Sequence, residues 1–167
     1  MTKTARDEII ARVLEREGGV KDVGDGKGLT RYGQTPGWLQ QFNLRPPSNA
    51  SEAADNYATW LSDTRLDRVI GDAADTLADA VIDWAVHSGH VTPVKALQVA
   101  LGVTADGAIG PGTLAALATQ DRRALAAHVI AARAELLGRL VAGQHGNVRF
   151  IKGWMNRLGE HIRALGA

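Results

Sequence analysis

The sequence predicts an α+β fold that is mainly helical, with one short glycine-rich β-hairpin near the N-terminus. Alanine is abundant and apolar residues recur at helical spacing in several segments, whereas β-branched residues rarely alternate as they do in strands. Glycine is concentrated between positions 18 and 33, where six glycines indicate tight turns. A chain of 167 residues with 45% hydrophobic residues has enough apolar material for one globular domain.

The composition argues against several classes of protein. The 19 basic and 18 acidic residues leave a formal net charge of +1, which argues against a dedicated nucleic-acid binder. Cysteine is absent and the five histidines have no supporting metal motif, so we predict no metal and no cofactor. No apolar run approaches the roughly 18 residues of a membrane span. Residues 1–8 already include two acidic residues, Asp7 and Glu8, and they lack the apolar stretch that a secretion signal contains.

The beginning of the chain predicts a helix followed by the hairpin. Apolar residues between positions 3 and 16 form an amphipathic stripe, and Gly18 and Gly19 are expected to end that helix. The hairpin is expected to comprise Val20–Val23, a Gly24-Asp25-Gly26 turn and Leu29–Tyr32.

Further helices are expected along the rest of the chain. Three prolines between positions 36 and 47 indicate an irregular segment, after which Ser48 or Ser51 is expected to cap a helix. Residues 73–87 are apolar on most sides, which predicts a central buried helix. The remaining predicted elements are a short piece around 66–70, a helix over 93–101, a helix opened by Pro111, and two longer closing helices.

Glu17 is the first candidate catalytic residue. It stands at the C-terminus of the first predicted helix, where the partial negative charge disfavours an ionised carboxylate and so suits a general acid. Asp25 lies in the hairpin turn, and a helix-end Glu with a hairpin Asp is the two-carboxylate layout of a glycosidase. The plain alternative is that Glu17 is only a solvated helix end.

The same loop allows a second interpretation, a calcium-binding site. Asp22, Asp25 and the neighbouring glycines are of the residue types that such loops contain. The spacing is not that of an EF-hand, and no Glu follows at the twelfth position, which argues against calcium.

Several motifs, in order along nearly the whole chain, resemble the muramidases of glycoside hydrolase family 108. The opening is similar in Glu17-Gly18-Gly19, the Asp- and Gly-rich loop and Thr30-Arg31-Tyr32-Gly33. The stretch from Asp83 to Gly89 is similar to the end of one of the family's helices. Residues 98–113 look like the peptidoglycan-binding segment that habitually follows, and Phe150 to Trp154 match the final helix.

The resemblance implies a lysozyme-like fold and an N-acetylmuramidase, which cuts the β-1,4 bond between N-acetylmuramic acid and N-acetylglucosamine. By position, Glu17 matches the catalytic acid, while Asp25 and Thr30 would hold a water on the far face of the sugar, with inversion of configuration. An inverting pair needs carboxyl groups about 6.5 to 9.5 Å apart. Asp22 is the alternative to Asp25, because the loop is one residue shorter than the family pattern.

Four residues are candidates for substrate binding, namely Asp22, Tyr32, Trp38 and His87. The ring of Tyr32 could stack on a sugar, with packing on the core as an equal alternative. Trp38 lies in the predicted irregular segment, which favours an exposed sugar platform. His87 stands where the family usually has Asn. For the other three tryptophans, at 60, 84 and 154, core packing is the preferred interpretation.

We expect residues 1–90 to form the lysozyme-like catalytic region and residues 91–167 a helical peptidoglycan-binding region packed on it as one compact unit. The cleft is expected between the hairpin and the central helix. The expected partner is bacterial peptidoglycan, bound by a monomer with no nucleic acid and no stable membrane association.

The expected setting is a phage-type endolysin that collects in the host cytoplasm and needs a separate holin-like pore to reach the wall. A virion-associated lysin is the alternative setting. Two rival functions stay open, a lytic transglycosylase that uses Glu17 alone and a non-catalytic wall-binding or virion protein.

Overall fold

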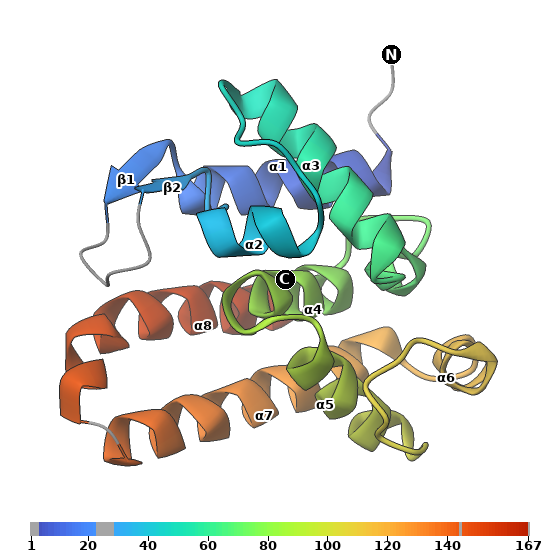
Figure 1. The fold of residues 1–167 in the computed structure, drawn as a ribbon. Helices are drawn as coiled ribbons and strands as arrows, with labels where there is room; N and C mark the ends of the chain where they lie inside the picture. Colours follow the sequence, from blue (N-terminus) through green and yellow to red (C-terminus); the bar gives the residue numbers. More distant parts are fainter. Residues whose placement is uncertain (1–3, 23–28, 144, 167) are drawn as a thin grey trace. The chain divides into compact units, whose positions relative to one another are not determined.

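The computed structural model describes residues 4–22, 29–143 and 145–166, which form two compact units (Figure 1). The first unit is Met1–Ala74 and the second is Asp75–Ala167. The described residues form helices and one small antiparallel sheet near the N-terminus, which confirms the predicted fold class. None of the helices in these described ranges combines the length and the apolar character that a membrane crossing requires.

The first unit contains a helix, the predicted hairpin and further helical elements. In chain order these are α1 (Ala5–Glu17), β1 (Val20–Asp22), β2 (Leu29–Arg31), α2 (Pro36–Gln41), α3 (Ala50–Asp63) and the 3₁₀ helix η1 (Leu66–Val69). The hairpin register pairs Val20 with Arg31 and Lys21 with Thr30.

Helix α1 begins with a capping box formed by Thr4 and Asp7. The Thr4 hydroxyl accepts a hydrogen bond from the Asp7 N–H at 3.2 Å, and the Asp7 carboxylate accepts one from the Thr4 N–H at 3.0 Å. This reciprocal cap satisfies two N–H groups at the start of the helix. The helix then buries Ile9, Ile10 and Val13 and packs against α3.

Two predictions for the middle of the first unit are wrong. The segment after Pro36 is not irregular, because Thr35 caps helix α2 and proline occupies its first turn, where no N–H is needed. Helix α3 is capped neither by Ser48 nor by Ser51. Its cap is Asn49, whose side-chain oxygen accepts from the Glu52 N–H at 3.0 Å.

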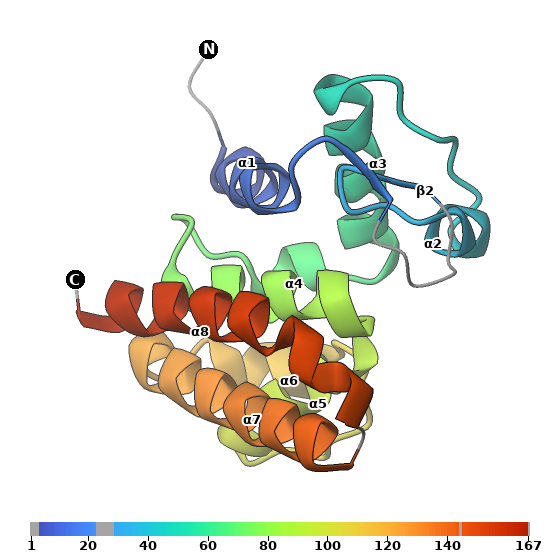
Figure 2. The same cartoon turned by 90° about the vertical axis from the view of Figure 1, so that its left-hand side faces the viewer.

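Helices and connecting loops make up the described residues of the second unit, which contain no strand. Its elements are α4 (Thr76–Ser88), α5 (Val91–Leu101), α6 (Pro111–Leu117), α7 (Arg122–Gly143), the 3₁₀ helix η2 (His145–Phe150) and α8 (Ile151–Gly166). Helix α7 packs against α4, α5 and α8, and Figures 1 and 2 both show α8 returning alongside it. All nine residues from Leu77 to Ala85 are buried, which confirms α4 as a central buried helix.

A buried glutamine holds the loop between α5 and α6. Gln98 is 1% exposed, and its side-chain N–H groups donate to the Asp106 carboxylate at 2.7 Å and to the Ala108 carbonyl at 2.9 Å. Its carbonyl oxygen accepts from the Gly107 N–H at 2.8 Å. Gly107 has a φ of +84°, and a Cβ there would stand 2.8 Å from a methyl carbon of Val91, so the turn requires glycine.

The division into compact units differs from the expected functional division. The units separate between Ala74 and Asp75, so α4 packs with the C-terminal helices. The functional division into residues 1–90 and 91–167 stays a prediction.

Candidate active site

Glu17 lies at the C-terminus of α1, as predicted, and is half-buried. Directly after it, Gly18 takes a φ of +67° and donates its N–H to the Leu14 carbonyl at 2.9 Å. Glycine adopts this conformation at little cost, so the chain leaves the helix immediately after the carboxyl side chain.

The turn that follows β2 lies against the Glu17 side chain. Tyr32 and Gly33 have φ values of 52° and 80°, and Arg31 and Gln34 exchange backbone hydrogen bonds of 3.2 and 2.9 Å across them. A Cβ at Gly33 would stand 2.5 Å from the Glu17 Cγ and 2.7 Å from the Tyr57 hydroxyl oxygen. Any larger residue at position 33 would therefore clash with the side chains of Glu17 and Tyr57, so the position requires glycine.

Helix α3 fixes this turn through two polar side chains. The Tyr57 hydroxyl donates to the Tyr32 carbonyl at 2.8 Å. Gln34 is 1% exposed and donates to the Ala53 carbonyl at 2.9 Å, while Asn56 donates to the Gln34 side-chain oxygen at 2.8 Å. Buried polar groups that are satisfied in this way rigidify their surroundings.

Sequence reasoning missed the supporting roles of Tyr57 and Gln34. Their partners lie 25 and 19 positions away, too far apart for local spacing to reveal. One sequence feature could have indicated the role of Gln34, namely that this polar residue directly follows the Tyr32-Gly33 pair in a predicted turn.

The other candidates for the catalytic step are only partly described. Thr30 lies on β2 opposite Lys21 and is half-buried. Asp22 is the last residue of β1, and its side chain lies outside the described part of the structure. Asp25 also lies outside the described residues, so the two-carboxylate arrangement stays a prediction.

Trp38 belongs to an aromatic cluster of the first unit. It is half-buried, and its ring centroid lies 5.6 Å from that of Tyr57 and 5.7 Å from that of Trp60. Trp60 is 1% exposed, which confirms the core packing predicted for it. Tyr32 is half-buried, and the sugar contacts expected of Tyr32 and Trp38 stay predictions.

His87 lies in the second unit, in the last turn of α4, and is exposed. Its Nδ1 is 2.8 Å from the Asp83 carbonyl oxygen. Trp84 is 3% exposed, which confirms its predicted core packing, whereas Trp154 is half-buried and stacks on Phe150 with ring centroids 5.9 Å apart.

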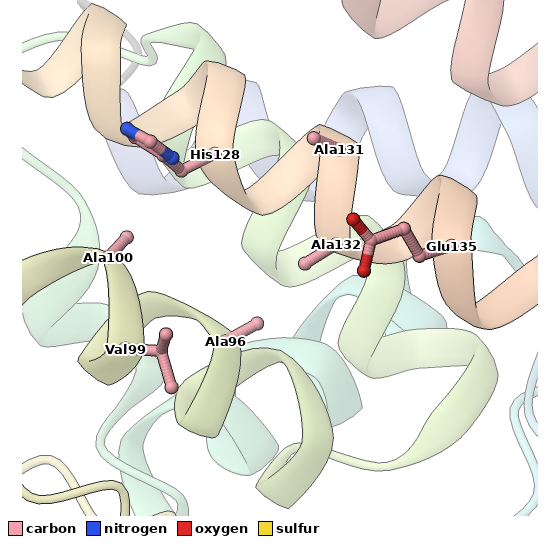
Figure 3. Close-up of a pocket in the computed structure, with 7 residues that line it drawn as sticks. All are labelled: Ala96, Val99, Ala100, His128, Ala131, Ala132 and Glu135. Atoms are coloured by element: carbon pink, nitrogen blue, oxygen red, sulfur yellow. The ribbon is translucent and has the colours of Figure 1, made fainter.

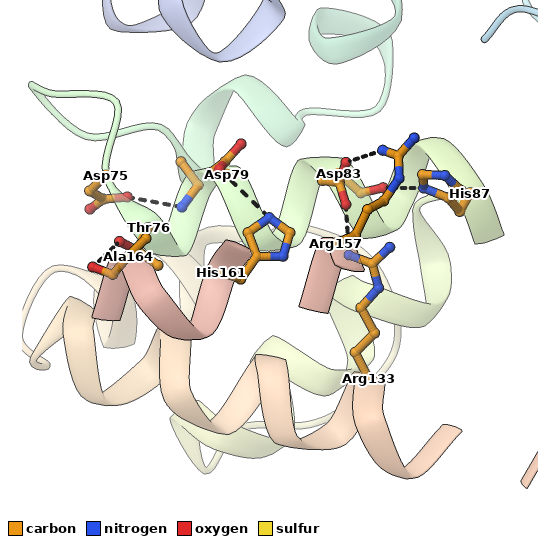
Figure 4. A network of polar contacts seen from close by, with 10 residues as sticks. Asp75, Thr76, Asp79, Asp83, His87, Arg133, Arg157, His161 and Ala164 are labelled. Carbon is orange, nitrogen blue, oxygen red and sulfur yellow. Dashed lines mark hydrogen bonds and ion pairs between the residues drawn. The ribbon is translucent and has the colours of Figure 1, made fainter. Parts of the chain in front are cut away.

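Beside His87 lies a buried ion cluster, made of Asp83, Arg133 and Arg157, that sequence reasoning did not single out (Figure 4). Arg133 of α7 and Arg157 of α8 each donate to one oxygen of the Asp83 carboxylate, both at 2.7 Å. Burial by itself would raise the pKa of Asp83. The charges of Arg133, His87 and Arg157 outweigh it and lower this pKa to about 2.

A separate groove between α5 and α7 brings together none of the predicted site residues (Figure 3). It has a volume of about 470 Å³, and its walls are mostly alanine, with His128 and Glu135 both projecting from α7. Within the described ranges, no group of three or more His, Asp or Glu side chains is placed to hold a metal ion.

Comparison with known proteins defines the class to which this fold belongs. A family model described as a predicted peptidoglycan domain matches residues 92–159. The structure of Brucella abortus SagA is similar with a TM-score of 0.71 and 32% sequence identity, over 96% of this chain and 94% of that chain. No curated protein sequence matches at a significant level.

These matches define a peptidoglycan-associated protein with a lysozyme-like fold. The chain belongs to the same family as SagA, since the two are 32% identical over 96% of this chain.

Proposed function

We propose that the protein is a peptidoglycan hydrolase, an N-acetylmuramidase of the family 108 type, with Glu17 as its general acid. The observation that carries this proposal is the placement of Glu17. It is the last residue of α1, and its side chain packs against Gly33 close to the Tyr57 hydroxyl. A carboxyl group held by rigid backbone is suited to proton transfer, which requires a fixed geometry. The match to the predicted peptidoglycan domain supports peptidoglycan as the substrate class.

In the proposed reaction Glu17 protonates the oxygen that links N-acetylmuramic acid to N-acetylglucosamine. Asp25 takes a proton from a water on the opposite face of the sugar, and Thr30 holds that water, so the product is inverted. Asp22 is the alternative base. The proposed substrate contacts are Tyr32 and Trp38 in the first unit and His87 in the second.

The proposed setting is a phage-type endolysin or a virion-associated lysin. In either setting the substrate is the bacterial wall, and the proposed functional regions are residues 1–90 for cleavage and 91–167 for wall binding.

The first test is clearing of purified peptidoglycan by the native protein and by Glu17→Gln. Removal of a general acid lowers rates by about 10²- to 10⁴-fold, so Glu17→Gln should clear at most about 1% as fast. The matched control is Glu15→Gln, an exposed carboxylate two residues earlier in α1, which should clear at the native rate.

Mass spectrometry of the fragments separates the rival functions. Reducing muramic acid ends support the muramidase, and their loss in Asp25→Asn or Thr30→Ala supports the inverting pair. Anhydro-muramic ends, with both variants active, would instead assign a lytic transglycosylase. Binding to the wall without any clearing would leave a non-catalytic wall-binding protein.

A further inference from the structure

The second unit exposes a strip of apolar side chains along α8. Ile151, Met155 and Ile162 are 38%, 41% and 53% exposed, and their spacing of four and seven residues places them on one side of the helix. Large apolar side chains that gather on one exposed side of a helix mark an interaction surface. The proposed proton transfer by Glu17 does not use this strip.

An apolar groove runs beside the strip. It has a volume of about 340 Å³ and lies between α7 and α8, which pack side by side (Figure 2). Every residue that lines it is Gly, Ala, Val, Leu, Ile or Met, and Ile151 and Met155 belong to both the groove and the strip. The two therefore form one continuous apolar surface, which we call the α7–α8 face.

The chain that builds this face is basic. Residues 136–159 contain four arginines and lysines and no aspartate or glutamate. Lys152 directly follows Ile151, Arg163 directly follows Ile162, and both basic residues are exposed. Glu160 is the only acidic residue of α8 and stands two positions before Ile162, roughly 160° around the helix from it. The strip is therefore bordered by positive charge.

An apolar centre with a basic border matches the surface of an anionic lipid bilayer. Isoleucine and methionine side chains can enter the acyl region while lysine and arginine reach the phosphate groups above it. A second copy of this chain fits poorly, because a symmetric pair through this face would bring the same positive charges together. A glycan strand offers mainly hydroxyl and amide groups, which do not match an apolar surface of this kind.

We propose that the α7–α8 face binds the surface of a bilayer that contains anionic phospholipids. The contact is peripheral, because it uses three exposed apolar side chains and none of the described helices is long and apolar enough to cross a membrane. It is therefore reversible, unlike a stable membrane association. The contact would keep the protein at the membrane side of the wall, and it does not depend on catalysis by Glu17.

Sedimentation of the whole native protein with lipid vesicles tests this proposal in the absence of peptidoglycan. Vesicles of equal parts phosphatidylglycerol and phosphatidylcholine are compared with vesicles of phosphatidylcholine alone. Each basic side chain near an anionic surface contributes about fivefold in affinity, so the anionic vesicles should bind at least about tenfold more tightly. Raising the salt concentration to about 0.5 M should remove most of this preference.

Matched variants locate the binding face. Ile162→Asp places a negative charge in the strip and should weaken binding to the anionic vesicles at least about tenfold. Val99→Asp makes the same change in net charge at a 69% exposed residue of α5 and should bind as the native protein does. Lys152→Gln and Arg163→Gln should each weaken binding about fivefold, whereas Arg123→Gln, at an exposed position near the start of α7, should not.

The absence of cysteine from the chain allows a direct measurement of the contact. A polarity-sensitive fluorophore attached to Ile162→Cys should shift its emission to the blue when anionic vesicles are added. The same label on Val99→Cys should not shift. This measurement requires no loss of binding, so it tests the proposal even if a charged variant fails to fold.

The outcomes separate this inference from the proposed function. No binding to anionic vesicles, or a shift of the label at position 99 instead of 162, would overturn the proposal. A dimer that Ile162→Asp dissociates, without vesicle binding, would assign the face to a second copy and overturn it as well. Binding to lipid-free peptidoglycan that Ile162→Asp abolishes, again without vesicle binding, would assign the face to the wall. Vesicle binding by a protein that clears no peptidoglycan would support this inference and reject only the hydrolase.

Discussion

The two units hold their important charged groups by opposite means. In the first unit, Glu17 is positioned by backbone conformation, with positive φ angles at Gly18 and Gly33 on either side of its side chain. In the second, Asp83 is held by side chains from two other helices and is 1% exposed. One carboxyl group is placed by the turns around it, and the other is fixed by the charges that neutralise it.

This difference predicts different consequences of mutation. Because Glu17 is only half-buried and is positioned by the backbone, replacing it should cost little packing. Changes near Glu17 should therefore lower the catalytic rate more than the stability of the fold. A buried ion cluster binds α4, α7 and α8 together, so changes at Asp83 should appear mainly in stability.

The largest effect on stability is expected for Asp83→Ala. Removing this carboxylate leaves the 4% exposed Arg133 as a buried cation without its partner, which should cost about 3–5 kcal/mol of unfolding free energy. Urea unfolding at pH 7 measures it, with the exposed Asp63→Ala as the control, expected within about 0.5 kcal/mol of native. A loss below about 1 kcal/mol would mean that the cluster does not hold the second unit together.

Gly33→Ala should strongly lower activity. Its Cβ would collide with Glu17 and Tyr57 and would need a positive φ, so the general acid should shift and clearing should fall about 100-fold. The control is Gly37→Ala in α2, where a Cβ meets no described atom within 4 Å and native activity is expected. Native activity in Gly33→Ala would show that the turn does not position Glu17.

Acid should weaken the second unit through Asp83. Its pKa is lowered from 3.8 to about 2 in the folded protein, so its carboxylate stabilises the fold above about pH 4. This contribution, about 2 kcal/mol, should be lost as the pH falls from about 4 to 2. Unfolding measured from pH 5 to 2.5 should show the native protein losing more stability than Asp83→Asn. Parallel curves for the two proteins would contradict the assignment.

The smallest effect on stability is expected at the N-terminal cap of α3, a local hydrogen bond in the first unit. Asn49→Ala removes the side-chain acceptor of the Glu52 N–H and should cost about 1 kcal/mol. Ser48→Ala keeps the backbone N–H that donates to the Glu52 carboxylate at 2.8 Å, so the change in its melting temperature should be much smaller. A larger loss in Ser48→Ala than in Asn49→Ala would mean that Ser48 is the capping residue after all.

Patterns within a few residues of each other were predictable from the sequence. Helical spacing and the glycine pair at 18 and 19 predicted α1 with Glu17 at its end, and the apolar run in 73–87 predicted the buried α4. Capping was less predictable, because Asn49 lies between two serines of similar capping strength and only the geometry distinguishes them.

The helical architecture, the hairpin and the position of Glu17 at a helix end could all be predicted from local sequence patterns, since they depend on local periodicity and on backbone preferences. In contrast, the packing of Gly33 and Tyr57 near the Glu17 side chain, and the contacts of Arg133 and Arg157 with Asp83, became visible only in the folded structure. Asp83 and its two partners are separated by 50 and 74 positions. No local rule connects residues so far apart, because their contact exists only once the helices have packed.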